Sequence, residues 1–208
     1  MPVKDKEAQE MILDIGKRIY AKNFVAANDG NISCKVGENA IRITPTGVSK
    51  GFMHKEMLIK MDLQGNILEG THKPSSEYRM HLRVYLENAE VGAVVHAHPP
   101  MATAFAVAGI ALDQPIYAEA LSFLGEVPLA PYGRQGTEAI PEAIAPYCKN
   151  YKALLLANHG VLTWGKDLTE AWYRMEAVEH YARILYYTRN LGNANVLNQA
   201  EVDYLKSL

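Results

Sequence analysis

The 208-residue sequence has little cysteine, little net charge and no long hydrophobic run. Its two cysteines, Cys34 and Cys148, are far apart in the chain, which argues against both a disulfide framework and a thiolate metal site. The formal net charge of −2 gives no electrostatic basis for binding nucleic acid or an anionic membrane. We therefore expect neither a nucleic-acid partner nor a membrane partner.

Targeting and membrane-spanning patterns are also missing. The longest weakly polar run, residues 101–112, is too short to cross a bilayer and contains Gly109. The first ten residues carry charges of both signs and lack the apolar core of a secretory signal. From these features we expect a cytoplasmic protein with reduced thiols.

The composition is that of a globular protein, with 49% hydrophobic and 21% charged residues. A chain of this length is sufficient for one sizeable core and short for two independent domains. Helical and hairpin patterns follow one another without a linker or a repeat. We therefore predict one layered α/β domain over residues 1–208, with a mostly antiparallel central sheet.

Apolar spacing, turn residues and capping signals place the expected elements along the chain. Helices are predicted at 4–24, from 74 onward, 99–108, 137–147, 167–192 and from 197 onward. Strands are predicted at 32–35, 40–44, 57–61, 92–98, 153–157 and 161–164. The segment 114–131 contains three prolines, and we expect it to be irregular or to form short extended pieces.

Histidines end two of the predicted strands. His96 and His98 follow the apolar run at 92–95, and His159 follows the run at 153–157. Residues two apart on a strand point to the same side, so the rings of His96 and His98 can converge. A third imidazole from another strand end would give three nitrogen ligands and an open position, the arrangement of a catalytic zinc site. The competing interpretation is three ordinary half-buried histidines.

Five motifs together resemble the class II aldolase/adducin family, and within it the L-fuculose-1-phosphate aldolases. They occur in the family's order: Gly30-Asn31, Thr44-Pro45-Thr46-Gly47, Pro74-Ser75-Ser76-Glu77, His96-Ala97-His98 and Asn158-His159-Gly160. The resemblance extends over nearly the whole chain. It implies a three-layer α/β/α fold around a largely antiparallel sheet. It also implies a homotetramer with sites at subunit boundaries and one zinc ion per subunit.

The resemblance further implies a lyase that reversibly cleaves a phosphorylated sugar. The expected substrate is a deoxyketose 1-phosphate, L-fuculose 1-phosphate above all, and the expected products are dihydroxyacetone phosphate and L-lactaldehyde. Cleavage of such a bond leaves negative charge on the ketone fragment. No lysine lies in an apolar pattern typical of a Schiff base, so a metal is the expected electron sink.

Roles of individual residues also follow from the resemblance. His96, His98 and His159 are expected to bind zinc, together with Glu77 in the resting enzyme. Glu77 is then expected to leave the ion and transfer a proton; otherwise it is a helix-start glutamate favoured by the helix dipole. Tyr117 is expected to stabilise charge on the aldehyde oxygen, the alternative being a buried structural tyrosine.

Phosphate binding is expected at three turns that present hydroxyl and backbone N–H groups. Ser75 and Ser76 precede a predicted helix, whose N-terminus favours an anion. Taken alone, each turn is more typical of a cap. The full expected set matches the family's phosphate-binding segments: Gly30, Asn31, Thr46, Gly47, Ser75 and Ser76.

Three positions depart from the family's pattern. Gln135 stands where an aromatic residue is expected beside the aldehyde, so the aldehyde preference is open. Glu119 is an additional acid, either exposed or typical of a dehydratase. Tyr204 in the tail aligns poorly with the family's C-terminal tyrosine, so its reach to a neighbouring site is open. His81, four residues after Glu77 on the same helix face, could support the site, but we expect it to be a packed or capping histidine.

Alternatives on the same scaffold are a pentulose-phosphate 4-epimerase, a thiosugar-phosphate dehydratase and an adducin-like protein-binding module. The epimerases tend to carry aspartate where Glu77 stands. The dehydratase is favoured only by Glu119. The protein-binding module would not need the three histidines, and their presence favours an enzyme.

Overall fold

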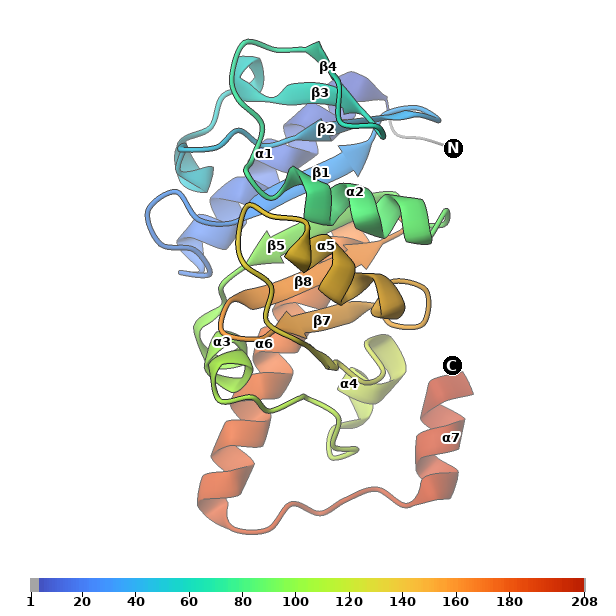
Figure 1. Cartoon of the computed structure of the whole chain (residues 1–208). Coiled ribbons are helices and arrows are strands. Elements are labelled where there is room, and N and C mark those ends of the chain that lie inside the picture. The colour runs from blue at the N-terminus through green and yellow to red at the C-terminus, as the bar shows by residue number, and fades with distance from the viewer. Residues whose placement is uncertain (1–3, 208) are drawn as a thin grey trace.

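The computed structural model describes residues 4–207 and contains one central sheet with helices on both faces (Figure 1). The strands are β1 (Asn31–Lys35), β2 (Ala40–Ile43), β3 (Ile59–Asp62), β4 (Ile67–Glu69), β5 (Ala93–Ala97), β6 (Leu129–Ala130), β7 (Ala153–Leu156) and β8 (Gly160–Gly165). The α-helices are α1 (Asp5–Ala21), α2 (Tyr78–Glu87), α3 (Pro100–Val107), α4 (Ala118–Phe123), α5 (Ala139–Ile144), α6 (Leu168–Leu191) and α7 (Gln199–Ser207). Short 3-10 turns are η1 (Lys50–Phe52), η2 (Lys55–Met57) and η3 (Ala145–Tyr147).

The eight strands form one sheet in the order β4-β3-β2-β1-β5-β8-β7-β6. Neighbouring strands in the described part of the chain are antiparallel except for β6 and β7, which are parallel. Hairpins join β1 to β2, β3 to β4 and β7 to β8, which accounts for the antiparallel pairing of these strands. The predicted sheet type is therefore confirmed.

Two hydrophobic cores, one on each face of the sheet, define three layers. Alternate strand residues point to opposite faces, so Val95 packs with α1, α3 and α6 while its neighbour Val94 packs with α2 and α5. In Figure 1, α2 and α5 lie on the near face of the sheet and α1 and α6 lie behind it. The α/β/α prediction is confirmed.

Local structure differs from the sequence prediction in three places. The segment 114–131 contains the helix α4, because no proline falls within its six residues and Ala120 and Leu121 face the core. Strand β4 was not predicted, since all three of its residues are exposed at the sheet edge. Helix α2 begins at Tyr78 rather than at 74, because residues 75–78 form a turn closed by the bond from Tyr78 N–H to the Ser75 carbonyl.

The central strands bring distant residues together at one end of the sheet. In the β1–β5 register Asn31 lies opposite His96, and in the β5–β8 register His96 lies opposite Leu162. The turn between β7 and β8 carries His159 to the same place.

None of the helices in residues 4–207 combines the length and apolar character needed to cross a membrane.

Candidate metal and active site

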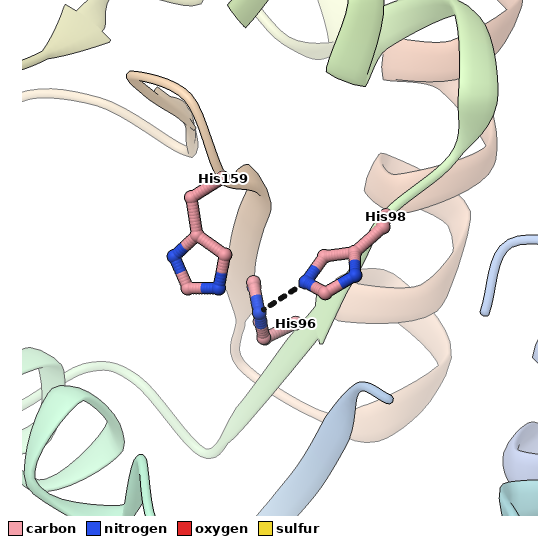
Figure 2. Close-up of side chains that lie close together, drawn as sticks. All are labelled: His96, His98 and His159. Atoms are coloured by element: carbon pink, nitrogen blue, oxygen red, sulfur yellow. Dashed lines mark hydrogen bonds between the residues drawn. The ribbon is translucent and has the colours of Figure 1, made fainter. Parts of the chain in front are cut away.

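Three histidine rings converge where β5 and β8 meet (Figure 2). The ring centroids of His96, His98 and His159 lie 4.7 to 5.1 Å apart, and one ligand atom from each ring lies within 4.8 Å of the others. His96 is fully buried and His159 is 9% exposed. The predicted convergence of these three residues is confirmed.

Contacts outside the cluster indicate which nitrogen carries the proton in the rings of His96 and His98. The Nδ1 atom of His96 lies 2.8 Å from the Val161 carbonyl, which can only accept, so His96 carries its proton on Nδ1. The Nδ1 atom of His98 lies 3.3 Å from an Asp29 carboxylate oxygen and is assigned in the same way. Both Nε2 atoms therefore present lone pairs, as metal-binding histidines do.

Burial favours the neutral form of these rings. Burial holds the pKa of His96 well below its usual value, and it also lowers the pKa of His98. Neutral imidazole is the form that binds metal ions, so both rings can bind a cation near neutral pH without first losing a proton.

Glu77 faces the histidines from the residue before α2. Its carboxylate oxygens lie 3.4 Å from His96 Nε2 and 3.2 Å from His159 Nε2, and Asn31 Nδ2 donates a 2.9 Å hydrogen bond to it. Burial raises the pKa of Glu77, and the hydrogen bond that its carboxylate accepts from the Asn31 amide lowers it. The side chain makes no capping bond to the helix, so it is directed to the histidines instead.

These residues fit a divalent cation. The Nε2 atoms of His96 and His98 lie 3.1 Å apart with lone pairs facing, an unfavourable contact that a cation between them would relieve. Two nitrogens about 2.0–2.1 Å from a tetrahedral zinc ion would lie about 3.3 Å apart, close to this spacing. Glu77 Oε1 and His159 Nε2 are buried and lie 3.2 Å apart, but neither makes a hydrogen bond in the described residues. All four groups therefore suit one shared ion.

Two glycines give the histidines their space. A Cβ atom on Gly160 would lie 2.5 Å from the His98 ring, so a larger residue would displace that ring. Gly30 has a φ of +76°, and a Cβ there would lie 3.0 Å from the His96 carbonyl oxygen. Gly30 thus has a structural role beside the site in addition to the phosphate contact expected of it.

The three predicted phosphate segments lie side by side. Pro45 and Pro74 form a bridge that joins the Thr46–Gly47 turn to the Ser75–Ser76 turn. Among the described residues, no backbone partner engages the N–H of Gly47 or Ser76, and Thr46, Gly47 and Ser76 are exposed. The side chain of Asn31 is instead buried and engaged with Glu77 and His81.

A buried lysine, which the sequence pattern did not reveal, holds two of these turns together. Lys50 is 1% exposed, and its Nζ donates hydrogen bonds to the carbonyls of Asn28 (2.9 Å) and Val48 (2.6 Å). Burial lowers the pKa of Lys50 to about 8. The amine is committed to these carbonyls rather than presented to a substrate, which suits a tether better than a Schiff-base nucleophile.

Three further residues singled out in the sequence, Tyr117, Glu119 and Tyr204, lie just before α4, in α4 and in α7. Tyr117 precedes α4, and its ring packs 5.9 Å from the ring of His180 on α6. Within residues 4–207, no hydrogen bond or ion pair joins Tyr117 to the histidines, and its catalytic role stays a prediction. Glu119 is exposed on α4, and Tyr204 on α7 is 61% exposed.

Sequence reasoning missed two supports of the site. Asp29, which holds His98, was visible only as part of a turn. His81 is fully buried and bonded to the Asn31 side chain, so the expectation of a merely packed histidine is incomplete. The four-residue spacing from Glu77 placed His81 on the correct helix face, but it could not reveal a partner 50 residues earlier in the chain.

Comparison with protein families gives one match over most of the chain. Residues 10–186 match the family described as Class II Aldolase and Adducin N-terminal domain.

Individual relatives are named for different activities. An L-fuculose phosphate aldolase from Methanococcus maripaludis is 36% identical over 84% of this chain and 93% of its own length. A 3-oxo-tetronate 4-phosphate decarboxylase from Haemophilus influenzae is 33% identical over 98% of both chains. A solved structure of an L-fuculose 1-phosphate aldolase has a TM-score of 0.91 and 28% identity, covering 99% of this chain and 97% of its own.

Proposed function

Because this chain belongs to the class II aldolase and adducin family, and is thereby a metal-dependent lyase, we propose that it is a zinc-dependent aldolase. The proposed reaction is reversible cleavage of a deoxyketose 1-phosphate, with L-fuculose 1-phosphate as the preferred substrate. The products are dihydroxyacetone phosphate and L-lactaldehyde. The similarity to an L-fuculose phosphate aldolase over most of the chain supports this substrate.

One observation carries the proposal. Three imidazoles and one carboxylate meet at a point where two of their buried polar atoms make no hydrogen bond within the described residues. Three imidazoles with a nearby carboxylate are a donor set that zinc favours. A zinc ion held by His96, His98 and His159 would supply positive charge to stabilise negative charge on the substrate oxygens.

The residues of the chain then have separate tasks in the proposed reaction. When the carbon–carbon bond breaks, its electron pair stays on the ketone fragment and the other fragment leaves as an aldehyde. As the aldehyde forms, the hydroxyl group on its carbon gives up its proton to solvent. Glu77, protonated beforehand, delivers its own proton to the carbon that holds this electron pair and regains one from solvent, so the cycle neither gains nor loses a proton. The turns at Thr46–Gly47 and Ser75–Ser76 hold the phosphate, and Tyr117 stabilises charge on the aldehyde oxygen.

A second candidate is decarboxylation of a 3-oxo acid phosphate, which the relative matched over 98% of this chain favours. Loss of carbon dioxide also leaves an electron pair next to a carbonyl group, so the same charged site and the same proton donor would serve. The two reactions differ in the fragment that departs, and this difference can be measured directly.

The test is a product assay on the zinc-loaded protein. L-fuculose 1-phosphate and its stereoisomers are supplied separately, as is 3-oxo-tetronate 4-phosphate, and released aldehyde and carbon dioxide are quantified. Fastest release of aldehyde from L-fuculose 1-phosphate is the expected result. Release of carbon dioxide without aldehyde would establish the decarboxylase instead, and an isomerised sugar without either product would indicate an epimerase.

We further propose that the protein is a homotetramer with sites at subunit boundaries. The long helix α6 supports this assembly, because Tyr173, Tyr186 and Tyr187 on it are 46–57% exposed. Large exposed aromatic side chains are typical of protein interfaces. Light scattering of the purified protein should give four times the mass of the 23.1 kDa chain, and a monomer would contradict the proposal.

A further inference from the structure

A chain of buried hydrogen bonds leads from Glu77 into the core between α2 and the sheet. Asn31 Nδ2 donates to the Glu77 carboxylate at 2.9 Å, and Asn31 Oδ1 is bonded to His81 Nε2. The other ring nitrogen of His81 lies 2.7 Å from Ser33 Oγ, which in turn lies 2.7 Å from the Tyr85 hydroxyl. Asn31, Ser33, His81 and Tyr85 are 3% exposed or less.

The bond between Asn31 and Glu77 determines which atom donates and which accepts in each of the other hydrogen bonds. Asn31 Nδ2 can only donate and lies 2.9 Å from a Glu77 carboxylate oxygen, so the amide oxygen of Asn31 faces His81. An amide oxygen also only accepts, so His81 must carry its proton on Nε2. Its Nδ1 then accepts from Ser33, and Ser33 accepts from Tyr85.

His81 therefore adopts the opposite tautomer from His96 and His98, which carry their protons on Nδ1. Its ring also decides which way the Asn31 amide faces. With the amide reversed, the amide oxygen would face the Glu77 carboxylate and repel it. A packing role would require only a side chain of suitable size, whereas this geometry uses both ring nitrogens in defined roles.

We propose that His81 is a positioning residue for Glu77, acting through the Asn31 side chain, whose nitrogen it keeps directed at the carboxylate. This inference rests on the proposed function only for the proton transfer by Glu77. His81 itself does not contact the substrate. It belongs to the outer groups that orient a catalytic residue, and loss of such groups typically costs about 10- to 100-fold in activity or metal affinity.

The first experiment determines which ring nitrogen of His81 carries the proton, and it requires neither substrate nor metal. In nitrogen NMR of histidine-labelled protein, we expect the signal that disappears in the His81→Gln variant to come from a neutral ring protonated on Nε2. The rings of His96 and His98 should be protonated on Nδ1. A His81 ring protonated on Nδ1, or exchanging between tautomers, would overturn the proposal whether or not the protein is an aldolase.

The second experiment compares two replacements of similar polarity. His81→Gln keeps an N–H donor near the position of Nε2 and can still direct Asn31, whereas His81→Asn reaches only the position of Nδ1. At saturating zinc, we expect His81→Asn to lower kcat by about 10- to 100-fold with KM and melting temperature nearly unchanged. His81→Gln should retain most of the activity.

The matched control is Tyr85→Phe, which removes the far end of the chain of bonds. Ser33 keeps its hydroxyl in this variant and can still donate to His81, so kcat should change less than about threefold. Equal losses in the Gln and Asn variants, or losses that follow unfolding, would contradict the positioning role. If no lyase activity is found in the unaltered protein, the proposed function fails and the tautomer measurement alone decides the inference.

Discussion

Two clusters of charged and polar side chains lie in different parts of the sheet, and they differ in how completely the chain satisfies them. At the β2–β3–β4 side, Arg42 is 6% exposed, and its guanidinium bonds both oxygens of Asp5 at 2.6 and 2.9 Å and also contacts Glu69. Lys60 lies 3.2 Å from Asp5 and 3.3 Å from Glu69. Every charge in this ion-pair cluster has a partner of opposite sign.

The histidine cluster of His96, His98, His159 and Glu77 is different. Lone pairs of two rings face each other at 3.1 Å, and two buried polar atoms have no hydrogen-bond partner in the described residues. A buried polar group without a partner costs about 1–3 kcal/mol. The comparison teaches that a cluster whose charges are all paired within the chain stabilises the fold, whereas a more deeply buried cluster with unsatisfied polar atoms identifies a site for a ligand.

The largest effect is expected on breaking the histidine cluster. His96→Ala removes one nitrogen ligand and should reduce bound zinc from one per chain to near background. Because a bound ion contributes several kcal/mol to charge stabilisation, activity should fall by at least about 10³-fold. Elemental analysis and the product assay measure both quantities. His54→Ala, at an exposed histidine, is the matched control, and full zinc content in His96→Ala would contradict the assignment.

A smaller effect is expected when the proposed proton transfer by Glu77 is removed and the three histidines are left intact. Glu77→Gln keeps the shape of the side chain but cannot transfer a proton, so exchange of solvent deuterium into dihydroxyacetone phosphate should fall by about 10²- to 10⁴-fold. The zinc content should remain near one per chain. Glu56→Gln, at an exposed carboxylate, serves as the control. Undiminished exchange in Glu77→Gln would remove Glu77 from the mechanism.

Loss of the phosphate contacts should have a moderate effect. The double variant Ser75→Ala with Ser76→Ala removes hydroxyl donors to an anion, each worth about 1.5–3 kcal/mol when bonded to a charged group. Binding of a phosphate-bearing inhibitor should weaken by about 10²-fold or more, with zinc retained. Ser122→Ala on α4 is the control, and unchanged inhibition in the double variant would move the phosphate site elsewhere.

The smallest effect is expected in the ion-pair cluster, and it concerns stability alone. The Arg42 hydrogen bond lowers the pKa of Asp5 from its ordinary 3.8 to about 2. A carboxylate with a lowered folded-state pKa adds stability above pH 3.8 that is lost as pH falls toward 2. Allowing for solvent screening, Asp5→Asn should cost about 1 kcal/mol at pH 7.

Urea unfolding at several pH values tests this expectation. The difference between Asp5→Asn and the unaltered protein should shrink as the pH falls from 4 to 2, while zinc content and activity at pH 7 stay unchanged. A difference independent of pH, or a loss of zinc, would show that the two clusters are not separate.

The sequence predicted the layers and the sheet type well because strand and helix periodicities are local and strong. The same local rules failed at β4, whose three exposed residues carry no burial pattern, and at α4, which lies between prolines. Both elements depend on neighbours that are distant in the chain. Strand β4 pairs with β3, and α4 packs near α6 and α7.

In the site, too, some residues could be predicted from the sequence and others could not. His96, His98 and His159 could be predicted because each ends an apolar run, and strand ends gather at one edge of a sheet. The groups that orient the histidines and Glu77 could not be predicted. Asp29, Val161 and Asn31 act through hydrogen bonds whose partners are set by the folded chain rather than by local sequence. Lys50 was missed for a related reason, since only the folded chain shows that its amine is enclosed by two backbone carbonyls.

The most direct measurement is anomalous X-ray diffraction at the zinc absorption edge from crystals grown with zinc. We expect one strong peak per chain, about 2.0–2.1 Å from the Nε2 atoms of His96, His98 and His159. A peak bound by other residues, or histidine rings turned away from a common point, would contradict the shared cation on which the proposed chemistry depends.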